Sequence, residues 1–165
     1  MAHRHENNLT GEHRYGDIGQ LILFCLFMAL WVLDIVLEYS NFLNEDVLLT
    51  VRLPIGILLL IVSGYLARTG LTIAFGKNAQ SQGVIREGVF GLVRHPIYLS
   101  EMVLYLGLLV LNISLAAAFI WIIATLFLHY ISRYEEKLLL ARFGDEYKQY
   151  IKEVGMWLPR IYRNK

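Results

Sequence analysis

The sequence has very little of what builds disulfides, zinc centres or phosphate-binding loops. Its one cysteine, Cys25, lies inside an apolar run, which excludes an internal disulfide and a cysteine cluster for a metal. A glycine-rich loop that ends in lysine is absent, and so is a helix with two histidines one turn apart. Phosphoryl transfer and zinc-dependent hydrolysis are therefore poorly supported.

Charge of either sign is also sparse. The 165 residues carry a formal net charge of +1, and the basic residues are interspersed with acidic ones, so no nucleic-acid partner is expected. The first seventeen residues are polar and contain no stretch typical of a signal peptide. We expect them to form a solvated tail in which His3, His5 and His13 have no assigned role.

Apolar residues dominate what is present. They make up 56% of the chain, and the mean hydropathy of +0.49 is too high for an ordinary soluble domain. The sequence predicts an all-α, polytopic membrane bundle with four transmembrane helices. A helix needs about 20 residues to cross a membrane. The predicted spans are 18–37, 47–66, 97–111 and 115–132, of which the third is shorter than a full crossing.

A single domain is expected over residues 1–165, divided into a polar head (1–17), two N-terminal spans (18–66) and a C-terminal half (67–165). Segment 67–93 contains five glycines, too many for a continuous helix, and is expected to be irregular or a short hairpin. Beyond the fourth span, apolar residues recur at helical spacing from 143 to 154, which predicts an amphipathic helix on the inner membrane surface. Gly144 and Asp145 are expected to end one helix and cap the next.

The distribution of basic residues predicts the orientation. Loop 37–46 contains acidic residues but no lysine or arginine, so it is expected to face outward. The polar head, the segment before the third span and the region from Arg133 onward hold the other basic residues, which predicts that both termini and the segment before the third span are cytoplasmic. Arg52 is an exception near the outer surface. A structural ion pair with Asp34 or snorkelling explains it best, with a transport role as a minor alternative.

A polar junction stands where the loop enters the third span. His95 precedes a proline and is therefore biased to an extended backbone, whereas Pro96 suits the first position of a helix. A helix start offers free N–H groups and a partial positive charge, and Arg94 and His95 lie beside this one. We expect it to bind a carboxylate or phosphate, such as an anionic group of a cofactor.

Two acidic residues leave the fourth span on the same side, where the helical hairpin brings them next to this junction. Glu135 and Glu136 point about 100° apart on a helix and therefore need separate accounts. Glu136 can pair with Arg133, whereas Glu135 is expected to reach solvent or to accept hydrogen bonds from a ligand. Glu101 and His129 lie at comparable depth and form a functional or a structural pair across the hairpin.

The order of these motifs resembles the integral membrane methyltransferases of the isoprenylcysteine carboxyl methyltransferase and phospholipid methyltransferase type. The matching positions are Gly88, Phe90, Arg94-His95-Pro96, Tyr98, Glu135-Glu136, Leu138, Phe143-Gly144, Tyr147, Tyr150 and Pro159. They cover the second half of the chain, and the first two spans carry no such signature. The family often has glycine where this chain has Ser100, whose hydroxyl could narrow a pocket or bond back to its helix.

The resemblance implies that the C-terminal half binds S-adenosylmethionine and that a methyl group passes to a lipophilic acceptor at the cytosolic face. The implied cofactor-binding residues are Arg94, His95, Pro96, Tyr98, Glu135 and Glu136. The basic and tyrosine side chains would engage the methionine carboxylate, and the glutamates the ribose or amino end. The candidate catalytic residues are Arg94, Glu101 and Glu135. Methyl transfer depends mainly on positioning the acceptor within about 3 to 3.5 Å, and a base is needed only for a protonated acceptor.

Several alternatives stay open at this point. The acceptor can be a prenylated cysteine, an amino-headgroup phospholipid, a quinone-like lipid or a foreign hydrophobic molecule, and the oligomeric state is undetermined. An NADPH-dependent membrane reductase of the sterol-reductase type is a second enzymatic hypothesis, and a non-enzymatic membrane scaffold is a third. For the methyltransferase, Arg94→Ala and His95→Ala are expected to retain the fold and to weaken cofactor binding.

Overall fold

The computed structural model describes residues 16–76 and 83–160 of the chain. The three N-terminal histidines, His3, His5 and His13, lie outside these residues. The α-helices are α1 (Gly16–Leu37), α2 (Leu49–Phe75), α3 (Pro96–Leu111), α4 (Leu115–Phe143) and α5 (Asp145–Glu153), and the 3-10 helices are η2 (Phe42–Asn44) and η3 (Gly88–Gly91). Within the described residues there is no strand, and one isolated parallel bridge joins Val93 to Gly155. The predicted all-α class is confirmed.

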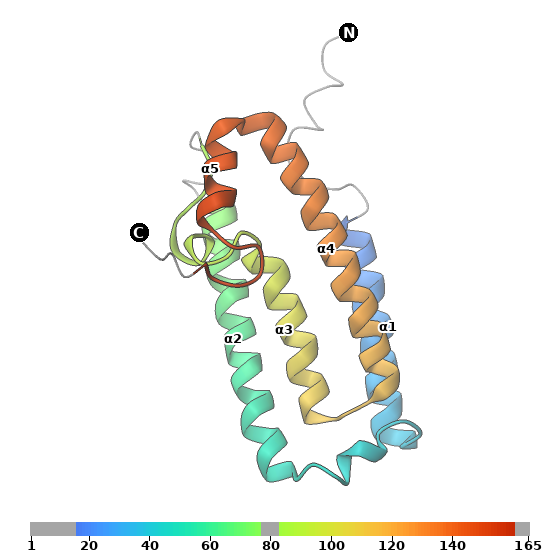
Figure 1. Ribbon diagram of the computed structural model, residues 1–165. Helices are drawn as coiled ribbons and strands as arrows, with labels where there is room; N and C mark the ends of the chain where they lie inside the picture. The colour runs from blue at the N-terminus through green and yellow to red at the C-terminus, as the bar shows by residue number, and fades with distance from the viewer. Residues whose placement is uncertain (1–15, 77–82, 161–165) are drawn as a thin grey trace.

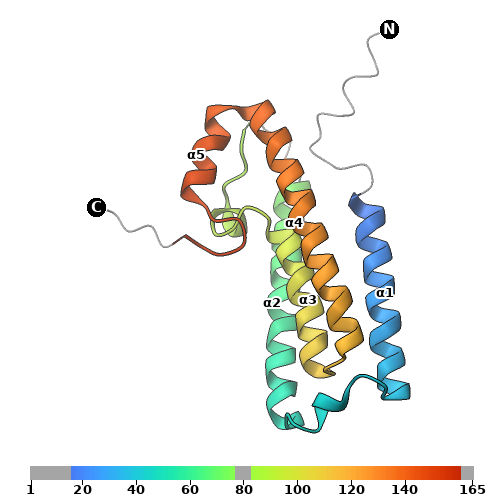
Figure 2. The ribbon, with the colours of Figure 1, turned by 45° about the vertical axis from the view of Figure 1, so that its right-hand side comes forward.

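The four long helices stand side by side as a bundle (Figure 1). α2 packs along α3, α1 packs along α4, and α3 contacts α4. The two views place α1 and α2 on opposite sides of the bundle (Figure 2). In the described part of the chain, α1, α2 and α4 are long and apolar enough to cross a membrane, whereas α3 has 16 residues and is shorter. Three of the four predicted spans thus have spanning length.

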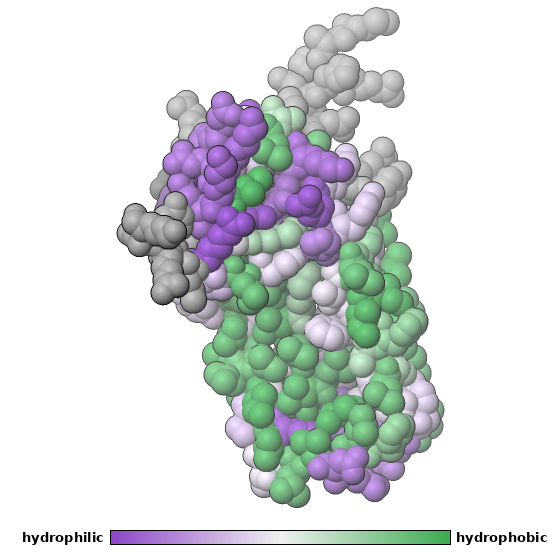
Figure 3. Space-filling model, viewed as in Figure 1, coloured by the Kyte–Doolittle hydropathy of each residue, from purple (hydrophilic) through white to green (hydrophobic). Residues whose placement is uncertain are grey.

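The surface shows the banding expected of such a bundle. Hydrophobic side chains cover the middle of the face in Figure 3, and hydrophilic ones gather at its two ends. One end carries the loop after α1 and the α3–α4 turn, and the other carries α5, the start of α3 and the end of α4 (Figure 1). The polar junction and the glutamate pair therefore lie at the same end of the molecule.

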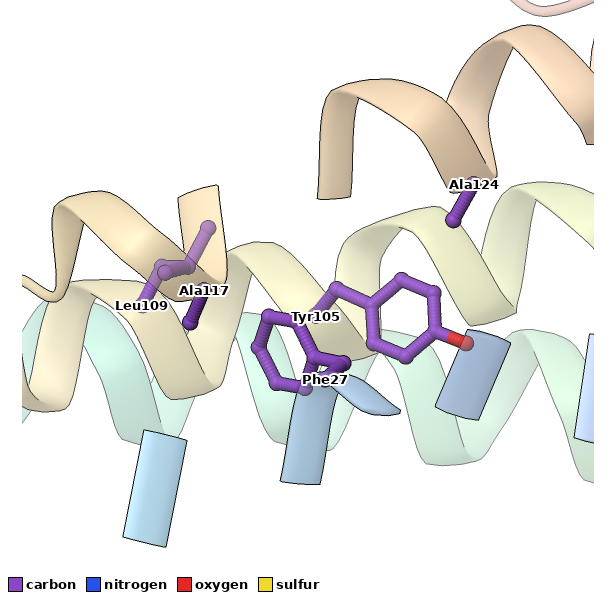
Figure 4. Close-up of a cluster of buried hydrophobic side chains, with 5 residues drawn as sticks. All are labelled: Phe27, Tyr105, Leu109, Ala117 and Ala124. Atoms are coloured by element: carbon purple, nitrogen blue, oxygen red, sulfur yellow. The ribbon is translucent and has the colours of Figure 1, made fainter. Parts of the chain in front are cut away.

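A cluster of buried side chains joins α1, α3 and α4 (Figure 4). The rings of Phe27 and Tyr105 lie 4.7 Å apart between centroids, and Leu109 completes the contribution of α3. Ala117 and Ala124 present only methyl groups from α4. Because lipid tails are as apolar as these side chains, close packing rather than burial from water favours this association.

Small residues let α2 and α3 approach closely. Gly56, Ser63 and Gly70 are spaced seven residues apart and are all buried, as helices in close contact require. A Cβ at Gly56 would lie 2.5 Å from Leu111 Cδ2, and one at Gly70 would lie 2.9 Å from Ile97 Cγ1. Ser63 donates a hydrogen bond of 2.7 Å to a carbonyl of α3. The contact extends along both helices to the polar end.

This contact explains why one sequence prediction was wrong. Residues 67–75 belong to α2, although the glycines of 67–93 predicted an irregular segment or hairpin from Ala67 onward. At Gly70 the helix continues, and a side chain of α3 occupies the space that a larger residue would need. Only the described part after Gly83 is irregular, with the turn η3 inside it. α4 is also longer than the predicted span and ends at Gly144, whose φ of 55° breaks the helix where the sequence predicts it.

The predicted ion pair between Arg52 and Asp34 is also wrong. Arg52 donates to the carbonyls of Val47 and Leu111 at 2.9 and 3.1 Å, and to the side chain of Asn44. Asp34 instead accepts hydrogen bonds of 2.7 and 2.6 Å from the backbone N–H and hydroxyl of Ser40. The loop after α1 and the Leu111 carbonyl at the end of α3 supply neutral partners to the two buried charges, so neither needs the other.

α5 packs its apolar side against the protein. Tyr147, Tyr150 and Val154 are buried against residues of α4 and the segment before η3. The Tyr150 hydroxyl donates to the Phe90 carbonyl at 2.7 Å, and burial raises the pKa of this phenol to about 12. The apolar face expected to lie on a membrane is thus occupied within the chain, and an interfacial position of α5 stays a prediction.

Candidate functional site

The junction that begins α3 is held by the C-terminal segment. Pro96 occupies the first turn of α3, as its fixed φ predicts. His95 before it has φ −125° and ψ 64°, so it is outside the helix but does not adopt the extended backbone that the His-Pro sequence predicts. The backbone N–H of Arg94 donates to the Gly155 carbonyl at 2.9 Å, next to the bridge between Val93 and Gly155. The segment after α5 therefore fixes the backbone from which the site side chains extend.

Arg94 is buried and connects α4 to the end of α5 by hydrogen bonds. Its Nε donates to Glu136 Oε1 at 2.7 Å, and its Nη1 donates to the carbonyls of Val154 and Ile151 at 2.6 and 3.3 Å. The residue is only 8% exposed, and Glu136 is 3% exposed. Since the last carbonyls of a helix have no partner within it, the guanidinium satisfies groups that burial would otherwise leave unpaired.

Glu136 collects three positively charged or potentially charged neighbours. Arg94 is the closest, Arg133 Nη1 lies 3.4 Å from Oε2, and His95 Nε2 lies 3.4 Å from Oε1. The predicted contact with Arg133 is thus present, but a residue 42 positions away makes the shorter one. Glu136 is therefore largely neutralised inside the protein, which suits a structural role for this carboxylate.

His95 is enclosed by aromatic rings and carboxylates. Its ring stacks at 17° on Tyr98, with centroids 5.9 Å apart, and Trp157 lies 5.7 Å away at 43°. His95 Nδ1 lies 3.8 Å from Glu135 Oε2. The Tyr98 hydroxyl donates to Glu135 Oε1. The two motifs, far apart in the sequence, form one connected network of hydrogen bonds, ion pairs and stacked rings.

A cavity of about 350 Å³ opens beside this network, within the size range of sites for small molecules. Its wall is built from α1, α2, the loop around η3, the start of α3 and α4. The lining residues are Asp17, Gln20, Leu71, Ala74, Phe75, Ile85, Phe90, Arg94, His95, Pro96, Ile97, Tyr98, Glu135 and Leu139. Polar groups thus stand at the ends of α1, α3 and α4, and apolar side chains of α2 complete the wall.

The other candidate residues lie apart from this cavity. Glu101 accepts a hydrogen bond of 2.9 Å from Tyr105 within α3, and His129 accepts one of 3.2 Å from Trp157 Nε1. The structure does not pair Glu101 with His129, and neither lines the cavity. Ser100 donates back to the Ile97 carbonyl at 2.5 Å, so its hydroxyl bonds within its own helix and does not narrow the cavity.

Four contributors to the site were missed by sequence reasoning. Asp17 and Gln20 come from the start of α1, and Phe75 from the end of α2, in the half of the chain without a recognisable motif. Trp157 lies against both His95 and His129. Polar residues at the start of an apolar stretch are ordinary helix ends, so no sequence signal distinguishes Asp17 and Gln20 from a solvated terminus.

Comparison with known proteins gives one finding. The family DUF1295, described as a protein of unknown function, matches residues 8–154, which include the junction, the glutamate pair and nearly all of the bundle. No curated protein and no solved structure gives a significant match. The chain therefore belongs to the DUF1295 family, a membrane-associated family of the steroid reductase/methyltransferase-like superfamily.

Proposed function

We propose that the protein is an S-adenosylmethionine-dependent methyltransferase that acts on a lipophilic acceptor at the cytoplasmic face of a membrane. The observation that carries this proposal is the cavity, because Glu135, Tyr98 and His95 line it together with apolar side chains from the end of α2. A water-soluble methyl donor and a lipid-soluble acceptor can meet only where polar and apolar surfaces adjoin, as they do in this cavity. The donor, when bound, supplies a methyl group on a positively charged sulfur.

The donor set fits a molecule that bears both a carboxylate and cationic groups. Glu135 offers carboxylate oxygens to an ammonium or to ribose hydroxyls, and Tyr98 holds it by a hydrogen bond. His95 and the N-terminus of α3 offer donors to a carboxylate. Arg94 is bound to Glu136 and to the end of α5, so we assign it the role of positioning the carboxylate and the C-terminal segment.

The charge of the residues that line the cavity also helps to choose between a methyltransferase and a reductase. A reductase is the second candidate because the superfamily contains steroid reductases. NADPH is strongly anionic through its phosphates and needs several basic contacts. The basic residues that line the described cavity are Arg94 and His95, and Glu136 already neutralises Arg94. Two further carboxylates, Asp17 and Glu135, share the wall. The cavity therefore favours a cation-bearing donor over a dinucleotide.

The orientation follows from the basic residues of the sequence. Arg86 pairs with Glu153 of α5, Arg94 lines the cavity and Arg133 contacts Glu136, so these basic residues lie at the end of the bundle that carries the cavity. Glu45 and Asp46 belong to the loop after α1, which lies at the opposite end (Figure 1). By the excess of basic residues in cytoplasmic segments, the cavity and both termini face the cytoplasm. Cysteine labelling of single introduced sites in intact cells tests this orientation.

Direct binding separates the two enzymatic candidates. The purified protein in lipid nanodiscs is titrated calorimetrically with S-adenosylhomocysteine and with NADPH. We expect S-adenosylhomocysteine to bind and Glu135→Gln to weaken it about tenfold, because a hydrogen bond to a charged group is lost. The matched control is Glu45→Gln, which makes the same change at the opposite end of the bundle and leaves affinity unchanged. Binding of NADPH alone would exclude the methyltransferase.

Activity is tested with a labelled donor. Membrane lipids and hydrophobic extracts are incubated with the protein and methyl-labelled S-adenosylmethionine, and labelled products are separated by chromatography. A labelled lipophilic product that disappears with Glu135→Gln supports the proposal. The absence of both donor binding and labelled product would leave the scaffold hypothesis in its place.

A further inference from the structure

We infer that Arg86 is a positioning residue for the cavity: it ties the segment before η3 to α5 and thereby holds Ile85 and Phe90 in the cavity wall. The inference concerns whichever molecule fills the cavity, and it rests on the proposed function only for the ligand used in the test. Its starting point is that Ile85 and Phe90 both line the cavity, although neither belongs to an α-helix.

The segment around Ile85 depends on α5 for its position. Residues 84–86 have no regular secondary structure, and no backbone–backbone hydrogen bond among the described residues involves them. The backbone N–H of Val84 instead donates to Glu146 Oε1 at 3.1 Å, and the Val84 side chain packs on the buried tyrosines of α5. A segment without its own backbone hydrogen bonds opens easily unless such contacts hold it.

Arg86 makes the largest number of these contacts. Its Nη1 lies 3.0 Å from Glu153 Oε2, and its Nη2 donates to the Glu146 carbonyl at 2.9 Å. Its Cζ lies 5.6 Å from the centroid of the Tyr150 ring, within the range of a cation–π contact. Each contact is weak at a half-exposed position, but one rigid guanidinium makes all three at once. Ile85 is therefore held on both sides, by Val84 and by Arg86.

The second wall residue is held through the same ring. Tyr150, which lies under the Arg86 guanidinium, donates a hydrogen bond of 2.7 Å from its hydroxyl to the Phe90 carbonyl. Arg86 is not among the residues that line the cavity, so it acts through Ile85 and Phe90 rather than by touching a ligand. A ligand that binds against this wall needs the segment in place, and its apparent affinity falls with the fraction of molecules in which the segment is in place.

The test measures ligand affinity in the full-length protein. The purified protein in lipid nanodiscs is titrated calorimetrically with S-adenosylhomocysteine. Arg86→Ala is expected to weaken binding about fivefold, because the segment is then in place for only part of the time. Arg86→Lys keeps a positive charge for Glu153 but loses the planar fork, and is expected to weaken binding about twofold. The matched control is Lys148→Ala, which breaks a pair of 2.8 Å with Asp145 inside α5 and leaves the affinity unchanged.

A combined substitution separates positioning from a general loss of stability. Ile85→Ala with Phe90→Ala removes the side chains through which Arg86 acts, so the further change Arg86→Ala should weaken binding by less than about twofold in that variant. Amide hydrogen exchange gives a measurement without ligand. The amides of residues 84–92 should exchange about fivefold faster in Arg86→Ala, while those of α3 keep their rates.

An unchanged affinity in Arg86→Ala overturns the inference, and so does an undiminished effect of Arg86→Ala in the Ile85 and Phe90 variant. If Arg86→Ala does not fold, Arg86→Lys and Glu153→Gln, which removes the charge of the partner, carry the comparison. If S-adenosylhomocysteine does not bind the unmodified protein, the proposed function fails and amide exchange decides this inference. Faster exchange of residues 84–92 in the Arg86 variants then supports it, and unchanged exchange refutes it.

Discussion

Replacing Arg94 by alanine tests the structural reading of the site most directly. The change removes a cation that is 8% exposed and leaves Glu136, which is 3% exposed, without its closest partner. It also removes the donor to the carbonyls of Val154 and Ile151. Loss of one partner of a buried pair costs about 3 to 5 kcal/mol. Because Arg133 and His95 stay near Glu136, we expect about 3 kcal/mol.

That loss corresponds to a Tm lower by about 9 °C for a chain of this size. The assay is thermal unfolding of the protein in detergent, followed by circular dichroism and checked by size-exclusion chromatography. The matched control is Arg86→Ala, which breaks a pair of 3.0 Å with Glu153 whose side chains are 34% and 37% exposed. Half-exposed pairs contribute about 1 kcal/mol or less, so the control should shift Tm by about 3 °C at most.

A double substitution separates the buried charge from other effects. Arg94→Met with Glu136→Met removes both charges, so the uncompensated carboxylate disappears and about 2 kcal/mol of the loss is expected to return. The reasoning is refuted if Arg94→Ala unfolds within 3 °C of the unmodified protein, or if the double variant shows the plain sum of the single effects. An unchanged Tm in Arg94→Ala would mean that Arg94 is dispensable for folding and serves ligand binding alone.

Three further outcomes are expected. Gly56→Leu should lower the free energy of unfolding by about 1 to 3 kcal/mol because a Cβ at this position meets α3 at 2.5 Å. Gly64→Leu is the control and should not lower it, because no atom lies within 4 Å of a Cβ at Gly64. Equal Tm values for the two variants would contradict this packing. The pKa of Tyr150 is about 12 in the folded protein, so the unfolded chain ionises first and the free energy of unfolding should fall as the pH rises above about 10. In thermal melts over that pH range, Tyr150→Phe should lose less stability than the unmodified protein. Parallel curves of Tm against pH for the two proteins would argue against this role of Tyr150. Trp157→Ala should weaken S-adenosylhomocysteine binding about fivefold through the loss of a ring against His95, and Trp157→Phe should retain most of the affinity in calorimetry; an unchanged Trp157→Ala would remove this residue from the site.

Local patterns in the sequence predicted much of the fold. The lengths of the apolar stretches predicted the helices of the bundle, His-Pro predicted the start of α3, and Gly144 predicted the break before α5. These features depend on hydropathy, proline geometry and positive φ, all of which act over a few neighbouring residues. The end of α2 was missed because the glycines of this segment predicted a break, whereas Gly70 lies inside the helix at the point where Ile97 of α3 packs against it.

What the sequence determined by itself was the chemistry at the polar end: a basic, aromatic junction at a helix start and two glutamates one hairpin away. The tertiary structure decided which of these groups pair with one another inside the protein and which face the cavity. Arg94 and Glu136 neutralise each other, whereas Glu135 and Tyr98 line the cavity together with Asp17 and α2. The difference arises because residue types and spacing set what each side chain can bind, but helix register and packing set which partner it meets.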